Sequence, residues 1–248
     1  MAKNKKRNKK KVKSSKKNNL FRKFWRAIWI TIIFLFVVSV LLTIAYRFIN
    51  PPITILMIQR SIKQTLSSQE DVRIKKEWVE IDEISPNMIL AVVASEDNLF
   101  LKHNGFDKKA IEQAIEYNKL GKKVRGASTI SQQTAKNVFL WSGRNWVRKG
   151  LEAYYTFLLE LFWSKERIME VYLNVIEFGD GIYGVEAASK YYFNKSAKEL
   201  TKRESALLAS VLPSPLKRNP AKPTPWLNKR ALQVMNLMDK QGVIRLKD

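Results

Sequence analysis

The sequence of 248 residues contains no cysteine, a single histidine and no acidic residue before Glu70. The absence of cysteine excludes a disulfide framework. The single histidine, His103, has no Cys or acidic ligands at metal-binding spacing, so we expect it to hold the turn before Gly105 and not to bind a metal. Hydrolase nucleophile motifs are absent. Strand-like alternation is also scarce, and the chain is predicted to be mainly helical.

Positive charge is concentrated at the N-terminus, where 13 of the 45 Lys and Arg residues fall within residues 1–26. Because this head has almost no apolar residue, it cannot bury surface, and we expect it to be disordered. Nucleic acid or anionic lipid would suit its charge. Without the head and Arg47, the chain still carries 31 basic and 22 acidic residues.

Residues 27–46 form an uncharged run rich in Ile, Phe, Val and Leu. Such a run of about 20 residues spans a bilayer as a helix, so lipid is favoured over nucleic acid as the partner of the head. The basic head predicts a cytoplasmic N-terminus and an extracytoplasmic chain from Arg47 onward. A cleaved signal peptide is the alternative, but the run is longer than in most signals and no small-x-small pattern follows. We therefore predict an uncleaved, single-pass membrane anchor.

The rest of the chain is divided into a juxtamembrane part, 47–83, and a helical domain, 84–248. Pro51-Pro52 ends the spanning helix. Residues 53–68 are typical of a short amphipathic helix near the membrane. The polar run 67–71 is predicted to be a linker.

Within the helical domain, local patterns predict where helices begin and end. Apolar spacings of three and four predict helices at 88–94, 110–117, 151–162, 168–175 and 206–212. Capping boxes at 129–132 and 201–204 mark two helix starts. Pro213 is predicted to end one helix, and a Pro-rich connector at 217–225 to precede a last short helix.

Two adjacent acids, Glu96 and Asp97, follow the uncharged run 88–94 after a single serine, Ser95. Desolvation at the edge of a core raises the pKa of a carboxyl group, which makes Glu96 a candidate general base. A capped helix end with a solvated acid pair is the alternative, since perturbed acids also occur in structural networks. This segment alone leaves both interpretations open.

A second polar block extends from 125 to 137. A helix that begins near Ser128 would carry Ser128, Gln132 and Lys136 on one face at intervals of four, beside the free amides of its first turn. That face suits a phosphate or a sugar. An ordinary capped helix with a polar outer stripe is the alternative.

Two further blocks follow. Residues 137–147 mix Phe and Trp with Arg144 in a predicted loop, which is typical of a membrane interface or of core packing. Arg148 and Lys149 stand about one turn before Glu152, the spacing of an intrahelical salt bridge. Because Glu152 begins an apolar helix, its burial would be costly without a cationic partner.

The last block is a helix, 165–175, followed by a glycine-rich loop that contains Gly179, Gly181 and Gly184. Such a loop permits close backbone approach to a ligand or forms a tight turn between helices.

Taken in order, the blocks resemble the motifs of the peptidoglycan glycosyltransferases (glycosyltransferase family 51), which polymerise lipid-linked disaccharide into glycan strands. The resemblance covers 84–215, with Ala127 and Ser131 where the family often has Gly and Thr. The motifs stand here as Glu96-Asp97-x-x-Phe100-x-x-His103-x-Gly105, Gly126-x-Ser128-Thr129-Ile130-x-Gln132-Gln133-x-x-Lys136-Asn137, Arg148-Lys149-x-x-Glu152 and Lys165-x-x-Ile168-x-Glu170-x-Tyr172-Leu173-Asn174.

The resemblance implies a lysozyme-like helical larger lobe and a smaller membrane-facing lobe, held by the anchor in a bacterial cell membrane. It also implies the monofunctional form. About thirty residues follow Pro215, and the Lys-Thr-Gly triplet of penicillin-binding transpeptidases is absent.

The implied reaction polymerises lipid II, the undecaprenyl-pyrophosphate-linked GlcNAc-MurNAc-peptide, into β-1,4 glycan with inversion and release of polyprenyl pyrophosphate. Glu96 would be the general base. Lys136, Arg144 and Arg148 would neutralise the pyrophosphate, and Glu152 would orient these cations or a metal. The other implied roles are contacts to donor sugar or phosphate by Ser128, Gln132 and Gln133, shaping of the pocket by Phe100 and Asn137, and support by Asp97.

The candidate cofactor is a divalent cation, magnesium or manganese, with no organic cofactor. Expected partners are lipid II, the nascent glycan, membrane lipid and other cell-wall synthesis and division proteins, and nucleic acid is not expected. One rival is a peptidoglycan-cleaving enzyme, but a hydrolase has no pyrophosphate for the cations to hold. The other is a non-catalytic scaffold for anionic wall polymer, against which the acids Glu96 and Glu152 argue.

Overall fold

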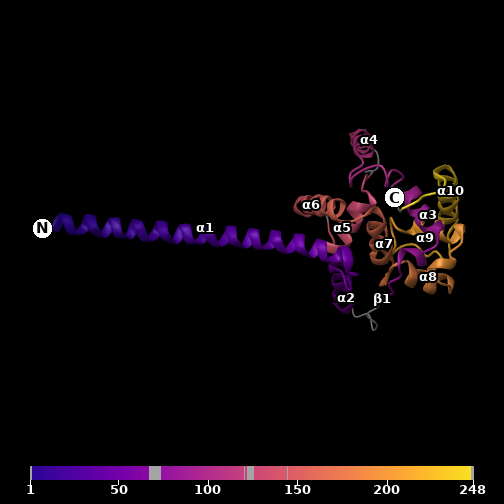
Figure 1. Cartoon of the computed structure of the whole chain (residues 1–248), viewed down its shortest axis with the longest axis horizontal. Coiled ribbons are helices and arrows are strands. Elements are labelled where there is room, and N and C mark those ends of the chain that lie inside the picture. Colours follow the sequence, from indigo (N-terminus) through magenta and orange to yellow (C-terminus); the bar gives the residue numbers. More distant parts are fainter. Residues whose placement is uncertain (1, 67–73, 120, 122–125, 144, 247–248) are drawn as a thin grey trace. The chain divides into compact units, whose positions relative to one another are not determined.

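Helices dominate the computed structural model, which describes residues 2–66, 74–119, 121, 126–143 and 145–246. The predicted linker at 67–71 and Arg144 lie outside these residues. The chain divides into two compact units, Met1–Ala45 and Tyr46–Asp248. The prediction of a mainly helical protein is confirmed (Figure 1).

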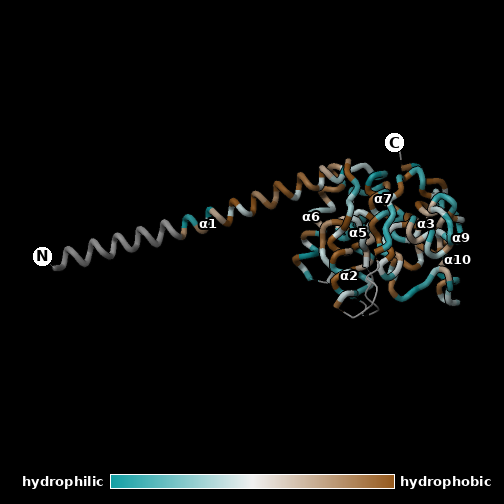
Figure 2. Tube along the Cα trace, turned by 90° about the horizontal axis from the view of Figure 1, so that it is seen from below, coloured by the Kyte–Doolittle hydropathy of each residue, from teal (hydrophilic) through white to brown (hydrophobic). Residues whose placement is uncertain are grey.

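The first unit belongs to a single helix, α1 (Ala2–Phe48). Its part from Phe21 to Phe48 is long and apolar enough to cross a membrane (Figure 2). Seven consecutive residues, Ile32 to Val38, all expose their side chains, so every face of the helix is apolar. A helix that is apolar all round and exposed is typical of a membrane span. This agrees with the predicted anchor.

The helix already begins at Ala2, so the structure differs from the prediction of a disordered basic head. Lys and Arg have nearly the helix propensity of Ala. The apolar helix that follows removes the cost of nucleation, which is the main obstacle to helix formation in a short segment. The basic head therefore extends α1.

The second unit contains nine α-helices in the described residues, and all five helices predicted from apolar spacing are present. They are α2 (Ile55–Leu66), α3 (Pro86–Glu96), α4 (Lys108–Lys119), α5 (Ile130–Phe139), α6 (Trp146–Phe162), α7 (Lys165–Val175), α8 (Val185–Phe193), α9 (Lys202–Val211) and α10 (Pro225–Gln241). Both predicted capping boxes form, at the starts of α5 and α9. The last helix is not short, because α10 has 17 residues.

Two groups of helices build the second unit (Figure 1). In one group α3, α9 and α10 pack on one another, and in the other α5 packs on α2, α6 and α7. Apolar side chains of both groups belong to one buried core. The C-terminal end of α3 and the first turns of α5 meet at the site described below.

The described strands form a small sheet of order β1-β3-β2. Its members are β1 (Lys75–Lys76), β2 (Glu177–Gly179) and β3 (Ile182–Tyr183), and two short 3₁₀ helices span Ile81–Glu83 and Ala197–Glu199. Gly184 has φ +84°, and a Cβ there would lie 2.8 Å from the carbonyl oxygen of Asn174. The glycine loop therefore closes tightly against α7, as expected for a turn and not for a ligand loop.

The fourth motif lies in α7, where two of its side chains hold the chain that precedes α3. Glu170 Oε2 accepts a hydrogen bond from Ile81 N at 3.1 Å. The Asn174 amide accepts from Val79 N at 2.9 Å and donates to Val79 O at 2.8 Å. Buried backbone polar groups need such partners. These two residues of the motif thus support the fold.

Candidate active site

Glu96 is the last residue of α3, and its carboxylate faces α5. Gln133 Nε2 donates to Glu96 Oε2 at 2.9 Å. Burial raises the pKa of Glu96, while the Gln133 donor and the charges of Arg230 and Lys136 lower it and the charge of Asp97 raises it. Because burial is the largest effect, the pKa lies above its ordinary value. The predicted direction of the shift is confirmed.

Asp97 ties the loop after α3 to the start of α5. Its carboxylate contacts His103 Nε2 at 2.8 Å and accepts from Ile130 N at 3.0 Å. His103 Nδ1 accepts from Gly105 N at 3.1 Å, which leaves the ring proton on Nε2 for Asp97. Gly105 has φ +84°, and a Cβ there would lie 2.7 Å from Thr156 Cγ2. The structural role predicted for His103 is confirmed, and Asp97 supports the same turn.

The N-terminus of α5 is closed by side chains of this chain. Thr129 and Gln132 form a reciprocal capping box, and Ile130 N is bound by Asp97. The expectation of free first-turn amides is therefore wrong for the N–H groups of Ile130 and Gln132. Because α5 begins at Ile130, Ser128 precedes the helix and does not share the face of Lys136.

Gln132 is placed differently from the prediction of a substrate contact. Its carboxamide oxygen accepts from Thr129 N at 3.0 Å, and the residue is 5% exposed. A side chain that is buried and engaged in a cap is not presented to a ligand.

Arg148, Lys149 and Glu152 form an ion cluster in the first turns of α6, in which Arg148 and Glu152 are buried and Lys149 is partly exposed. Arg148 Nη1 lies 2.8 Å from Glu152 Oε2, and Lys149 Nζ binds the other oxygen, Oε1. Glu152 is only 3% exposed, so its charge requires these partners. The predicted intrahelical salt bridge and the predicted cationic partner are both present.

Lys136 extends from α5 without a hydrogen bond or an ion pair to any residue that the structure describes. Burial lowers the pKa of its ammonium group; the charge of Glu152 opposes this shift, and that of Arg148 adds to it. Nε of Arg148 is likewise buried without a partner in the described part of the chain. Cations that are buried without a partner are stabilised by a bound anion.

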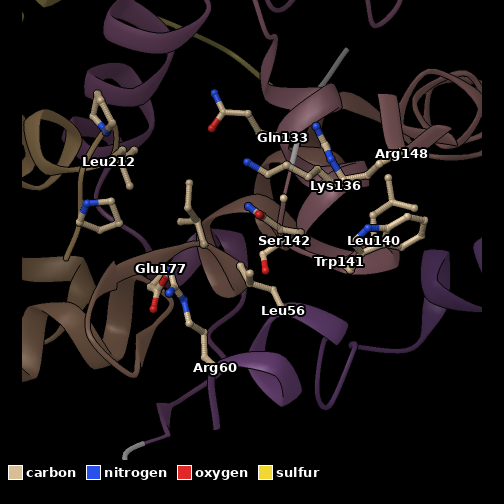
Figure 3. A pocket seen from close by; sticks show the side chains of 15 residues that line it. Leu56, Arg60, Gln133, Lys136, Leu140, Trp141, Ser142, Arg148, Glu177 and Leu212 are labelled. Atoms are coloured by element: carbon tan, nitrogen blue, oxygen red, sulfur yellow. The ribbon is translucent and has the colours of Figure 1, made fainter. Parts of the chain in front are cut away.

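A cavity of about 470 Å³, the cation pocket, lies over these groups (Figure 3). Lys136 and Arg148 line one side, while Arg60 of α2 and Glu177 of β2 line another. The remaining lining is apolar, aromatic or weakly polar: Leu56, Gln133, Asn137, Leu140, Trp141, Ser142, Gly143, Ile176, Leu212, Pro213 and Pro215. Two unpaired donors beside apolar walls suit a phosphate that is attached to an apolar chain or a sugar ring.

A second cavity, of about 640 Å³, contains Glu96 and is called the carboxylate pocket. Ser128, from the loop before α5, and Arg230, from α10, line it as well. Gln133 and Pro213 line both pockets. A molecule in one pocket can therefore meet a molecule in the other beside Gln133.

The remaining candidate residues differ in whether they line a pocket. Asn137 lines the cation pocket, as predicted. Phe100 is fully buried and lines neither of these two pockets; its ring packs under the turn that His103 holds, and its role in shaping the site stays a prediction. Of the aromatic block, Phe139 is buried in the core, whereas Trp146 is 90% exposed. Core packing thus holds for Phe139, and a membrane-interface role for Trp146 stays a prediction.

The charged pocket residues that were not among the predicted ones include Arg60, Glu177 and Arg230. Arg60 pairs with Glu177 at 3.3 Å in the cation pocket, and Arg230 lines the carboxylate pocket. The amphipathic pattern of 53–68 did not single out Arg60, and no local pattern connects that helix to Lys136. Arg230 reaches Glu96 only because α10 packs on α3.

The expected divalent cation has no donor set in the described residues, where no group of three His, Cys, Asp or Glu side chains could hold a metal. Both oxygens of Glu152 are bound by Arg148 and Lys149. Magnesium and manganese prefer several free oxygen ligands. The described residues therefore do not fit a metal held by the protein itself.

These features define a class of protein: a helical enzyme with one helix that is long and apolar enough to span a membrane, a buried carboxylate, and a cation-lined pocket that suits an anionic group. The sequence matches the profile of the family described as Transglycosylase over residues 61–239. The chain belongs to this family.

Relatives support the assignment along most of the chain. The chain is 54% identical over 208 residues to the biosynthetic peptidoglycan transglycosylase of Bacteroides thetaiotaomicron, with 84% of each chain covered. It is 51% identical to the protein of that name from Haemophilus influenzae (86% of this chain and 88% of the relative). It is 48% identical to the protein of the same name from Shewanella oneidensis, with 86% of this chain and 90% of the relative covered.

Proposed function

We propose that this chain polymerises lipid II into β-1,4-linked peptidoglycan strands and releases polyprenyl pyrophosphate. The observation that carries the proposal is the junction of the two pockets at Gln133, with the Glu96 carboxylate on one side and, on the other, the Lys136 ammonium group and Nε of Arg148, which have no partner among the described residues. Membership of the transglycosylase family and the names of the relatives support the same reaction.

In the proposed reaction the acceptor sugar occupies the carboxylate pocket, and the donor pyrophosphate occupies the cation pocket. Glu96 takes the proton from the acceptor hydroxyl as its oxygen forms a bond to the anomeric carbon of the donor. The bond from that carbon to the pyrophosphate oxygen breaks with inversion, and both electrons leave with the pyrophosphate. The raised pKa of Glu96 makes it a stronger base than an ordinary glutamate.

Lys136 and Arg148 stabilise the negative charge that develops on the pyrophosphate. Lys136 has no competing ion pair among the described residues, so its ammonium group is available to the leaving group. Glu152 holds Arg148 in place through their ion pair. Fixed charges in a partly buried site stabilise a developing charge more strongly than water does. Arg144, which lies outside the described residues, remains a predicted contributor.

We further propose that the anchor crosses a bacterial cell membrane once, with the basic head in the cytoplasm and the second unit outside. The 13 Lys and Arg residues in 1–26 support this orientation. Because the chain has no cysteine, single substitutions report topology directly. In spheroplasts, an impermeant thiol reagent should label Lys222→Cys and spare Ser14→Cys. Labelling of Ser14→Cys alone would show that the orientation is the opposite of the proposed one.

The proposed activity is tested with purified full-length chain in detergent, supplied with lipid II. We expect glycan strands together with free undecaprenyl pyrophosphate. Release of soluble fragments from finished cell wall, without polymer from lipid II, would instead identify a cleaving enzyme. Binding of wall polymer without either product would identify a scaffold. Recruitment by other cell-wall synthesis and division proteins stays a prediction.

A further inference from the structure

We propose that Tyr172 is a positioning residue for the general base: through Gln133 it fixes the direction of the amide that holds Glu96. The Tyr172 hydroxyl donates to Gln133 Oε1 at 3.3 Å, and Gln133 Nε2 donates to Glu96 Oε2 at 2.9 Å. The three residues come from α7, α5 and α3. The inference deepens the function proposed above and depends on it only for the role of Glu96.

The direction of the Gln133 amide matters because its two ends have nearly the same shape but opposite hydrogen-bonding character. In the observed orientation a donor faces the Glu96 carboxylate. If the amide turned over, a carbonyl oxygen would face the carboxylate instead. Two acceptors in contact repel, so ionised Glu96 would be destabilised.

Tyr172 selects the observed orientation because its hydroxyl must donate. The side chain is completely buried, and Gln133 Oε1 is its acceptor in the described part of the chain. With the amide reversed, the hydroxyl proton would be left without an acceptor in a buried place, which is costly. Burial and the charges of Glu96 and Asp97 raise the pKa of Tyr172 well above its ordinary value, so the phenol stays protonated.

The hydrogen bond from Gln133 serves Glu96 in two ways. It favours the ionised form against burial, and it occupies one carboxylate oxygen while the other stays available to an acceptor hydroxyl. The other charges that act on Glu96 are Arg230 of α10, Lys136 of α5 and Asp97 at the end of α3. None of them contacts the Tyr172 hydroxyl by hydrogen bond in the structure, so removal of that hydroxyl leaves them in place.

The test is the pH dependence of polymerisation by Tyr172→Phe. We expect the acid limb of kcat to move up by about one pH unit, which lowers the ionised fraction about tenfold well below the midpoint. The rate should recover at high pH, and KM for lipid II should change little. Tyr192→Phe is the matched control, because it removes a partly buried hydroxyl that contacts Phe178 O instead. Its profile should match that of the wild type.

Two further measurements distinguish a positioning role of Tyr172 from misfolding of the variant. They also distinguish failure of this inference from failure of the proposed function. Gln133→Leu should show the same upward shift, and the double variant with Tyr172→Phe should shift no further, since both act through one hydrogen bond. Carbodiimide labelling of Glu96, followed by peptide mass spectrometry against pH, should show the shift even in a chain that makes no glycan. An unmoved labelling midpoint in Tyr172→Phe, or additive shifts, would overturn the inference.

Discussion

Glu96→Gln is expected to abolish glycan polymerisation while leaving the fold and lipid II binding intact. The amide has the size of the carboxylate but cannot accept the hydroxyl proton, and loss of a general base lowers rates by about 10²–10⁴-fold. KM should change little, because the Lys136 and Arg148 side of the cation pocket is untouched. A buried neutral amide needs less solvation than a buried carboxylate, so stability should not fall. Polymer formation and thermal unfolding are the measurements.

Glu83→Gln is the control for this substitution, since Glu83 is an exposed acid that pairs with Lys198 away from both pockets. It should polymerise at the wild-type rate. In the wild type, the rate should fall as the pH drops through the pKa of Glu96, because only the ionised form accepts a proton. Since burial raises that pKa, the fall should begin at a higher pH than for an ordinary glutamate. Wild-type rates from Glu96→Gln would refute the mechanism.

The second large effect is expected from Lys136→Met, which should lower kcat/KM by about 10²–10³-fold, the range seen when one stabilising donor is removed from a transition state. Methionine keeps an unbranched apolar stem and removes only the charge. Because Lys136 has no ion pair among the described residues and burial lowers the pKa of its ammonium group, stability should stay the same or rise. Activity and stability should therefore move in different directions.

Steady-state kinetics and thermal unfolding of the full-length chain check this expectation. Lys198→Met, which removes an exposed lysine and its pair with Glu83, is the control and should leave kcat/KM unchanged. Lys136→Arg should recover part of the lost rate, since it restores the charge with a different shape. A full loss of rate accompanied by a large fall in unfolding temperature would assign Lys136 to the fold and not to the pyrophosphate.

Short-range features of the site followed from the sequence because they depend on neighbouring residues of one helix. Arg148 and Glu152 are four positions apart, so a helix brings them into contact whatever surrounds it. The capping box of Thr129 and Gln132 forms for the same reason. The capping box also shows the limit of local reasoning. The sequence predicts the box, which occupies the N–H group of Gln132, and yet the amides of the first turn were expected to be free for a ligand.

The errors arose where a distant residue competes for a group. Ile130 N looked free in the sequence, but Asp97, 33 positions earlier, occupies it. Phe100 lies close to Glu96 in the sequence, yet its ring is directed into the core, where it packs against the His103 ring. Neither contact has a periodicity that a local pattern could reveal.

The sequence by itself determined the apolar span, the helical class, the candidate base and the cationic block, because hydrophobic runs, helix periodicity and charge spacing are properties of contiguous residues. Only the tertiary structure decided that Glu96 meets Gln133 across 37 positions, and that Arg230 and Arg60 complete the two pockets. Those contacts exist because helices from distant parts of the chain pack on a shared apolar core. The packing sets which polar ends meet at its edge.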